Sequence, residues 1–262
     1  MNFWILVLEA FVILSLVFAG FWVYAKKINN YSIVDIIWSY AFIFILGFYV
    51  ITSKEVILRQ VLLLVMVGAW SLRLGTFLLR RIYSHHPEED RRYLTLRKKY
   101  APKVALQFFW FFQYQAWSVV ILSLLFLEVS LNTTSELSNL EIFGFALWVF
   151  AFCGEAVADA QKSAFRKESK NQDKICNIGL WRYSRHPNYF FESLIWFSYF
   201  IFALGTSGTW YTIYSPLLIL FLLLKVTGIP MAEAQSLKSR GEAFRKYQSE
   251  TSIFIPWWPR LK

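Results

Sequence analysis

The sequence predicts an all-α fold: a polytopic membrane bundle of seven transmembrane helices. Of the 262 residues, 57% are hydrophobic and 20% aromatic, which is more apolar surface than a soluble domain of this length can bury. The apolar residues fall in runs of roughly twenty, the length that crosses a bilayer as a helix. Lys and Arg are concentrated in alternate connecting segments, a pattern typical of polytopic proteins with basic cytoplasmic loops.

Seven apolar runs define the predicted spans. They are residues 3–25, 33–52, 56–79, 104–127, 139–160, 188–206 and 210–230. Helices are expected because every backbone N–H and C=O in lipid needs a partner within its own segment. Trp and Tyr are frequent at the ends of these runs, as in the aromatic belts of membrane interfaces. With no internal repeat or low-complexity linker, residues 1–262 are predicted to form a single membrane domain.

The distribution of Lys and Arg predicts the orientation of the chain. Eight follow the third run, seven follow the fifth and six lie in the tail, whereas none follows the fourth or the sixth. The N-terminus is therefore expected outside and the C-terminus in the cytoplasm. The first run lacks a basic n-region and precedes Lys26 and Lys27, so we expect a retained anchor rather than a cleaved signal peptide. The net charge of +10 is assigned to cytoplasmic loops, and no nucleic-acid partner is expected.

The cysteines and histidines predict no metal site. Cys153 and Cys176 lack a CxxC partner, so neither a disulfide framework nor a zinc site is indicated. His85 and His86 precede three acidic residues, but adjacent histidines in a loop are a weak metal signal.

Charged residues inside the predicted spans are functional candidates because burying a charge in lipid is costly. Asp35, in the second span, either donates a proton or pairs with Arg73, and both interpretations remain open. A second set, spaced by four, three and four residues, lies on one helix face as the fifth span ends. It comprises Glu155, Asp159, Lys162 and Arg166. This face suits a ligand with hydroxyl or amide groups at one end and phosphates at the other; the alternative is a ladder of internal ion pairs.

Two basic segments are candidates for anion binding. Residues 179–192 place Arg182, Arg185 and His186 before Pro187, which suits the first turn of a helix. The free N–H groups of that turn and these bases form an anion-receiving surface, or else a basic loop that only holds the helix at the membrane. In the loop 80–103, four residues suit a phosphate-bearing ligand or lipid headgroups. They are Arg92, Tyr93, Arg97 and Tyr100.

Neither GxGxxG nor GxxxxGK[ST] occurs in the chain, so no Rossmann or P-loop site is predicted. A nucleotide cofactor would need a membrane-surface site made of loops and helix ends.

A series of residues in the second half carries a family resemblance. It contains Ala158-Asp159-Ala160-Gln161-Lys162, Phe165-Arg166, Asn177, residues 179–189, Glu192, Gly228-Ile229-Pro230, Glu233, Tyr247, Thr251, Phe254 and Pro256. This series resembles the C-terminal half of the steroid 5-alpha-reductase superfamily, in particular its bacterial membrane proteins of unassigned substrate. The resemblance is strong over about 155–256 and looser over 30–100, where Ser32–Trp38 and Glu89–Arg97 carry it.

The resemblance implies a seven-helix bundle that binds NADPH from the cytoplasm and transfers hydride to an activated C=C bond of an apolar substrate. That substrate would be a steroid-like enone or an enoyl lipid, taken from the bilayer of a bacterial inner membrane. Residues 139–262 would form the cofactor-binding half and residues 1–138 the more divergent half. In such relatives, residues matching Asp159, Asn177, Arg182, His186 and Tyr189 contact the dinucleotide. The predicted cofactor site also includes Lys162, Arg166, Tyr183, Arg185, Glu192 and Tyr247.

We expect Arg182, His186 and Asp159 to line one common cavity. The substrate side carries over less well, because no Gln-Glu pair occurs in the early spans and Trp70 stands three residues before Arg73, where steroid reductases have Tyr. For enone reduction, a donor must stabilise the developing enolate oxygen, and Asp35 and Tyr93 are the candidate catalytic residues.

Two other functions remain open. Membrane methyltransferases of the isoprenylcysteine or phospholipid type share an Arg-His-Pro-x-Tyr turn with a downstream Glu, and bind S-adenosylmethionine. The third hypothesis is a non-enzymatic, lipid-binding membrane protein. No oligomeric state is indicated.

Overall fold

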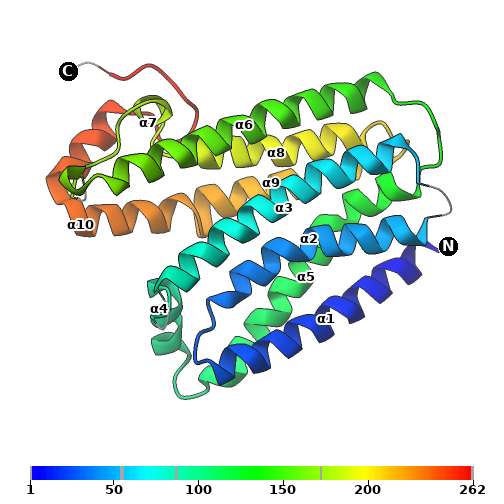
Figure 1. Cartoon of the computed structure of the whole chain (residues 1–262), viewed down its shortest axis with the longest axis horizontal. Helices are drawn as coiled ribbons and strands as arrows, with labels where there is room; N and C mark the ends of the chain where they lie inside the picture. Colours follow the sequence, from blue (N-terminus) through cyan, green and yellow to red (C-terminus); the bar gives the residue numbers. More distant parts are fainter. Residues whose placement is uncertain (1, 54–55, 86–87, 172, 261–262) are drawn as a thin grey trace. The chain divides into compact units, whose positions relative to one another are not determined.

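The computed structural model describes the chain except for residues 1, 54–55, 86–87, 172 and 261–262. Every regular element in the described residues is a helix, so the all-α prediction is confirmed (Figure 1). The helices fall into two compact units, Met1–Leu137 and Ser138–Lys262, called unit 1 and unit 2 below.

Unit 1 contains α1, α2, α3, α4 and α5. Their bounds are Phe3–Lys27, Ile33–Thr52, Leu58–His85, Arg91–Tyr100 and Val104–Leu131. Helix α2 packs against α3 and α5, and α1 packs against α5 and α2. Aromatic side chains fill this core: Trp70 is fully buried and meets Phe42 edge to face with ring centroids 5.3 Å apart. Trp70 is therefore a core residue of unit 1.

Side-chain hydrogen bonds fix the helix ends of unit 1. The buried guanidinium of Arg59 donates to the carbonyls of Thr134 and Glu136, the latter at 2.8 Å. These bonds tie the segment after α5 to the start of α3. At the opposite end Asp90 caps α4 by accepting the backbone N–H of Arg92 at 3.0 Å, which satisfies one of the free N–H groups of the first turn.

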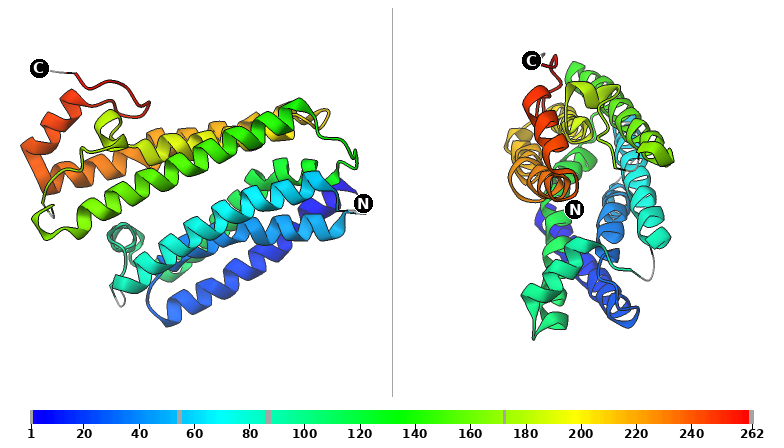
Figure 2. Two further views of the ribbon diagram at one scale, coloured as in Figure 1. Left: turned by 45° about the horizontal axis from the view of Figure 1, so that its top comes forward. Right: turned by 90° about the vertical axis from the view of Figure 1, so that its left-hand side faces the viewer.

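Unit 2 contains α6, η1, α7, α8, η2, α9, η3 and α10. Their bounds are Asn139–Lys167, Ser169–Asn171, Leu180–Tyr183, Pro187–Ala203, Thr209–Ile213, Tyr214–Phe221, Leu222–Val226 and Ile229–Glu250. Helices α6 and α8 run side by side along their length (Figure 2). Two glycines of α6 permit this approach, because a Cβ at Gly144 would clash with the Phe202 backbone and one at Gly154 with the Phe191 ring.

Six helical stretches of the described residues are long and apolar enough to cross a membrane. They are α1, α2, Leu58–Ser84 of α3, α5, α6 and the stretch Thr209–Glu250 that runs from η2 through α10. The protein is therefore an integral, multi-pass membrane protein. Helix α8 is also apolar but has 17 residues, so it rises only about 26 Å, slightly less than the roughly 30 Å hydrocarbon core.

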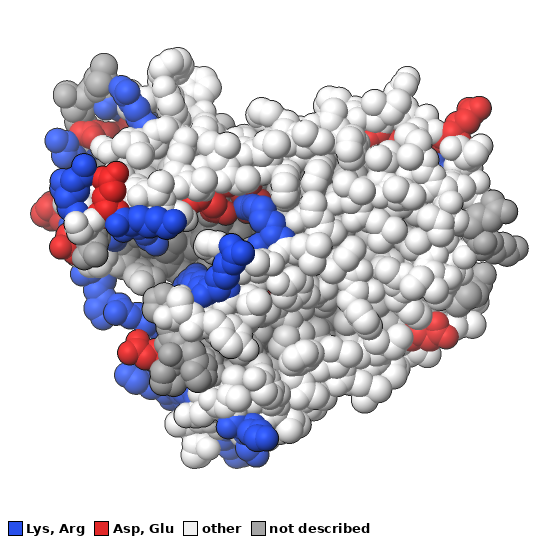
Figure 3. All heavy atoms as spheres, in the orientation of Figure 1, with Lys and Arg blue, Asp and Glu red and all other residues white. Residues whose placement is uncertain are grey.

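Basic side chains gather at helix ends within each unit. In unit 1 they occupy the last turn of α1 and half of the positions of α4; in unit 2 they occupy the last turn of α6. On the face shown in Figure 3, Lys and Arg cluster in this way while long stretches of the helices carry neither charge. Apolar helix bodies with basic ends are what a bilayer requires.

Candidate functional site

The turn before α8 is fixed on the end of α6. Gly179 has a φ of +54° and leaves no room for a Cβ, which would meet the Gln161 side chain. The Leu180 N–H donates to Oε1 of Gln161 at 2.9 Å, and Nε1 of Trp181 donates to the Ala158 carbonyl at 2.8 Å. Because glycine alone tolerates this backbone and this contact, the turn is held in one orientation.

Glu233 of α10 is the centre of a buried polar cluster. Its Oε1 accepts Nε of Arg185 at 2.7 Å and lies 3.2 Å from Nε2 of His186, while its Oε2 accepts the Gln248 amide at 2.7 Å. The second arm of the Arg185 guanidinium donates to the carbonyls of Thr251 at 2.6 Å and Gln248 at 3.0 Å. The side chain of Arg185 is only 8% exposed, so this arginine joins the turn to the end of α10.

Burial lowers the pKa of His186, and the hydrogen bond and charge of Glu233 oppose that shift only in part. The imidazole also stacks on Tyr189 with ring centroids 5.4 Å apart. The neutral ring is thus the favoured form in the folded protein, at a position where positive charge already surrounds it.

This shift predicts a pH dependence of stability. The pKa of His186 is lower in the folded state than the value of about 6.5 expected when unfolded, so the unfolded chain binds more protons on acidification. Its contribution to the free energy of unfolding is complete above about pH 6.5 and is lost as the pH falls through the folded pKa. We expect melting temperatures of purified protein to fall more steeply below pH 6.5 for the native sequence than for His186→Gln. If the melting temperatures of the two proteins fell equally steeply with pH, the predicted contribution of His186 would be contradicted.

A small cavity of about 70 Å³ beside this cluster is strongly basic, and is called the basic cavity below. Its lining includes Lys162, Arg166, Lys174, Arg185 and Arg240, and no Asp or Glu is among the described residues that line it. Such a lining attracts anions, although Glu233 offsets the charge of Arg185 from 2.7 Å away.

A larger cavity of about 370 Å³ lies between the turn and the chain that follows α10, and is called the tail cavity below. It is lined by Asn177, Arg182, Tyr247, Glu250, Thr251, Pro259 and Arg260. Tyr247 lines both cavities, and its buried hydroxyl donates to the Trp181 carbonyl.

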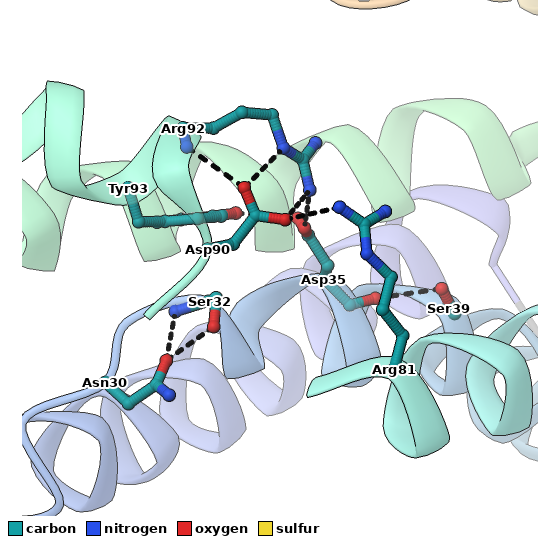
Figure 4. A network of polar contacts seen from close by, with 8 residues as sticks. All are labelled: Asn30, Ser32, Asp35, Ser39, Arg81, Asp90, Arg92 and Tyr93. Carbon is teal, nitrogen blue, oxygen red and sulfur yellow. Dashed lines mark hydrogen bonds and ion pairs between the residues drawn. The ribbon is translucent and has the colours of Figure 1, made fainter. Parts of the chain in front are cut away.

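In unit 1 the two candidate catalytic residues are hydrogen-bonded to each other. The Tyr93 hydroxyl donates to Oδ1 of Asp35 at 2.7 Å, and Arg92 donates to Oδ2 of the same carboxylate at 2.9 Å (Figure 4). Asp90 holds Arg92 from the other side, through Nε at 3.2 Å, and also accepts Arg81 at 2.7 Å. The first turn of α2 and the first turn of α4 thus form one polar network.

The electrostatics of this network keep Tyr93 protonated. Burial raises the pKa of Tyr93 well above its usual value, and the negative charge of Asp35 raises it further. Burial alone would raise the pKa of Asp90 too, but the charges of Arg92 and Arg81 hold it below the usual value. Tyr93 is therefore a neutral O–H donor at any physiological pH.

Comparison with known proteins shows the family. Residues 21–251 match the model of the family described as "Protein of unknown function (DUF1295)". The chain belongs to the DUF1295 family. No curated protein and no solved structure matches it. The family match spans parts of both units and ends just after α10, so residues 252–262 of this DUF1295 protein lie beyond it.

The predicted cofactor residues of this DUF1295 protein do not all line the same cavity of unit 2. Lys162, Arg166, Arg185 and His186 line the basic cavity; Asn177 and Arg182 line the tail cavity; Tyr247 lines both. Asp159 lines neither, so the expectation that Arg182, His186 and Asp159 share one cavity is not met by these two cavities.

The remaining cofactor candidates pack near the turn. Tyr189 stacks on His186, and the Tyr183 ring meets Trp258 edge to face at 5.5 Å. Glu192 accepts Nε1 of Trp196 at 2.9 Å, one turn along α8. These side chains support the turn or the helix that follows it.

Arg92 and Arg97, both in the predicted loop 80–103, form ion pairs within unit 1. Arg97 pairs with Glu89, donates to the Asn29 carbonyl at 3.0 Å and lies 4.6 Å from the centroid of the Tyr31 ring. Tyr100 packs edge to face on Phe108 at 5.2 Å. The ion pair that the structure shows for Asp35 is with Arg92, not with Arg73 as one sequence interpretation had it. His86 lies outside the described residues.

Two residues of the DUF1295 site were not among the predicted site residues. Glu233 appears in the sequence only as part of the family-like series, and Arg260 lies in the tail, beyond every recognised motif. The carboxylate just after Gly228-Ile229-Pro230 was the signal for Glu233, but its partners Arg185 and His186 lie 48 and 47 residues away, so no local spacing indicates them.

Proposed function

We propose that this DUF1295 protein is a membrane-embedded, NADPH-dependent reductase that transfers hydride to an activated C=C bond of an apolar substrate. The substrate class is a steroid-like enone or an enoyl lipid. One observation supports this most: five Lys or Arg residues line the basic cavity with no described carboxylate among them. The cavity is too small for a whole nucleotide, but its charge suits the pyrophosphate of a dinucleotide. The likeness to steroid 5-alpha-reductases supplies the reaction class.

The same observation favours NADPH over S-adenosylmethionine. S-adenosylmethionine has no phosphate, and although the bases of the basic cavity would attract its carboxylate, they would repel its sulfonium cation. A lipid phosphate would accept the same bases, so the non-enzymatic alternative needs an experiment to separate it.

Reduction of a C=C bond needs a hydride and a proton, and we assign the proton to the pair Asp35 and Tyr93. The bases of the basic cavity would hold NADPH by its pyrophosphate, and the bound cofactor would supply the hydride for the β-carbon. The Tyr93 hydroxyl gives its proton to the developing enolate, and solvent then restores that proton. Asp35 keeps the hydroxyl oriented through its 2.7 Å bond, and Arg92 holds the other oxygen of that side chain at 2.9 Å.

The proposal includes the topology. We propose that α8 also crosses the membrane beside α6, which gives seven spans with the N-terminus outside and the C-terminus in the cytoplasm of a bacterial inner membrane. The support is the charge distribution, because the basic residues of α4, α6 and α10 all belong to segments on one side in this topology. The basic cavity is lined from the basic end of α6 and from α10, and the tail cavity from α10 and the segments beside it; in this topology these segments are cytoplasmic, on the side where NADPH is available.

A thermal-shift titration tests the cofactor. At about 100 times its Kd, a ligand that binds only the folded state adds about 2.7 kcal/mol, so we expect NADPH to raise the melting temperature by several degrees. S-adenosylmethionine is expected to leave it unchanged. Arg166→Ala should weaken the NADPH shift, whereas Lys167→Ala, the adjacent exposed base that does not line the basic cavity, should not. If S-adenosylmethionine alone raised the melting temperature, the methyltransferase alternative would replace the reductase. If NADPH left the melting temperature unchanged, the assignment of NADPH as cofactor would be wrong.

The substrate can be found by mass spectrometry. Lipid extracts of cells with and without the protein are expected to differ by a lipid that gains two hydrogens when the protein is present. Extracts with no such pair would favour the non-enzymatic alternative.

A further inference from the structure

The segment that follows α10 lines the tail cavity, although all of it after Thr251 lies beyond the family match. Hydrogen bonds hold this tail, residues 251–260, against the turn before α8 and the end of α10. The Arg185 N–H donates to the Ser252 carbonyl at 2.8 Å and the Ser184 hydroxyl to the Phe254 carbonyl at 2.7 Å. The Trp257 N–H donates to the Tyr183 carbonyl at 2.9 Å and the Arg260 N–H to the Glu250 carbonyl at 2.8 Å. The tail is thus attached at both ends of its length.

This attachment places two arginines on one cavity. Arg182 comes from α7 and Arg260 from the tail, and both line the tail cavity. Within the part of the chain that the structure describes, neither guanidinium has an ion pair or a side-chain hydrogen bond. Arg185, three residues from Arg182, is in contrast fully engaged with Glu233 and two carbonyls. Arg182 and Arg260 are therefore available to a ligand in the tail cavity, whereas Arg185 is held inside the protein.

The charge and size of the tail cavity indicate the chemistry of that ligand. A phosphate monoester carries nearly two negative charges at neutral pH, and two guanidinium groups match it in charge and in hydrogen-bonding geometry. The Asn177 amide and the Glu250 carboxylate add partners for hydroxyl and amino groups, and Glu250 lies 3.9 Å from Lys246, which offsets its charge. A cavity of about 370 Å³ is in the range that holds small ligands. Together these features suit a nucleoside that bears a phosphate on its ribose.

We propose that Arg260 and Arg182 bind the 2′-phosphate of NADPH in the tail cavity, so that the tail of this chain sets the preference for NADPH over NADH. This inference rests on the proposed function and deepens it. The basic cavity, which shares Tyr247 with the tail cavity, would hold the pyrophosphate. NADH has a hydroxyl in place of the 2′-phosphate and gains nothing from Arg260.

The test compares two nucleotides on matched variants of the full-length protein in detergent or nanodiscs. NADPH and NADH are titrated by calorimetry against the native sequence, Arg260→Ala, Arg260→Lys and Arg245→Ala. Arg245 is an exposed base of α10 paired only with Glu242 among the described residues and lines neither cavity, so its variant removes the same charge elsewhere. The fragment 2′,5′-ADP, set against 5′-AMP, measures the 2′-phosphate directly.

We expect Arg260→Ala to weaken NADPH and 2′,5′-ADP binding about tenfold or more, the usual weight of a hydrogen bond to a charged group, and to leave NADH and 5′-AMP unchanged. Arg260→Lys should recover part of the loss, and Arg245→Ala should behave as the native sequence. If NADPH binds and Arg260→Ala leaves the NADPH-to-NADH ratio unchanged, the inference is overturned and the proposed function stands. If the native protein binds neither dinucleotide, both are overturned.

Discussion

Replacing Tyr93 with Phe is expected to lower the rate of hydride transfer at least about 100-fold, the usual contribution of a positioned general acid, while NADPH affinity stays the same. The ring of Tyr93 packs against Phe108 and Phe111, and Phe preserves that packing. Only the hydroxyl that donates to Asp35 is lost. The measurement is single-turnover oxidation of NADPH, followed by absorbance, with the reducible lipid identified from cell extracts.

Tyr100→Phe is the matched control for this prediction. Tyr100 lies on the same helix, α4, and packs on the same Phe108 ring, but it is not part of the Asp35 network. Its variant should retain the native rate within about twofold. The rate of Asp35→Asn should lie between those of Tyr93→Phe and Tyr100→Phe, since an amide oxygen still accepts the Tyr93 hydroxyl but carries no charge. A native rate in Tyr93→Phe would show that another group donates the proton.

The fold could be predicted from apolar run length, with errors where helices leave the membrane. Hydropathy located α1, α2, α5 and α6 to within a few residues, except that α5 and α6 continue beyond their predicted C-terminal ends. It did not indicate α4, whose ten residues are polar enough to be taken as loop. Hydropathy also did not indicate most of α10, which continues from an apolar run into twenty mainly polar residues. Helices at the membrane surface are stabilised by caps and tertiary packing rather than by lipid, so a search for apolar runs misses them.

The site could be predicted as a set of residue types but not as a set of partners. Asp35 and Tyr93 were each predicted as candidate proton donors, yet their hydrogen bond joins residues 58 positions apart, and no local spacing indicates it. Arg182 and Arg185 are the same residue type in the same turn, so the sequence does not distinguish their roles. Only the tertiary position of Glu233 shows that Arg185 is occupied inside the protein while Arg182 lines a cavity.

Replacing Glu233 with Ala is expected to destabilise the protein by about 3 kcal/mol or more, the usual cost of leaving one partner of a buried ion pair without its counter-charge. Glu233 is 13% exposed and Arg185 8% exposed, so water cannot replace the carboxylate well. The Gln248 amide and His186 would lose their acceptor as well. The measurement is reversible denaturant unfolding of the purified protein in mixed micelles, with Glu233→Gln expected to lose less because its side-chain oxygen can still accept one bond.

Glu242→Ala is the control, because Glu242 is on the same helix, pairs with Arg245 and is 89% exposed; exposed pairs of this kind contribute little. The double variant Arg185→Ala with Glu233→Ala decides whether the pair acts as a unit. If the loss of Glu233 is costly because it leaves Arg185 uncompensated, the double variant should be less destabilised than the sum of the two single variants. Strict additivity would mean that Arg185 is held mainly by the Gln248 and Thr251 carbonyls, and that Glu233 acts on the turn through His186 instead.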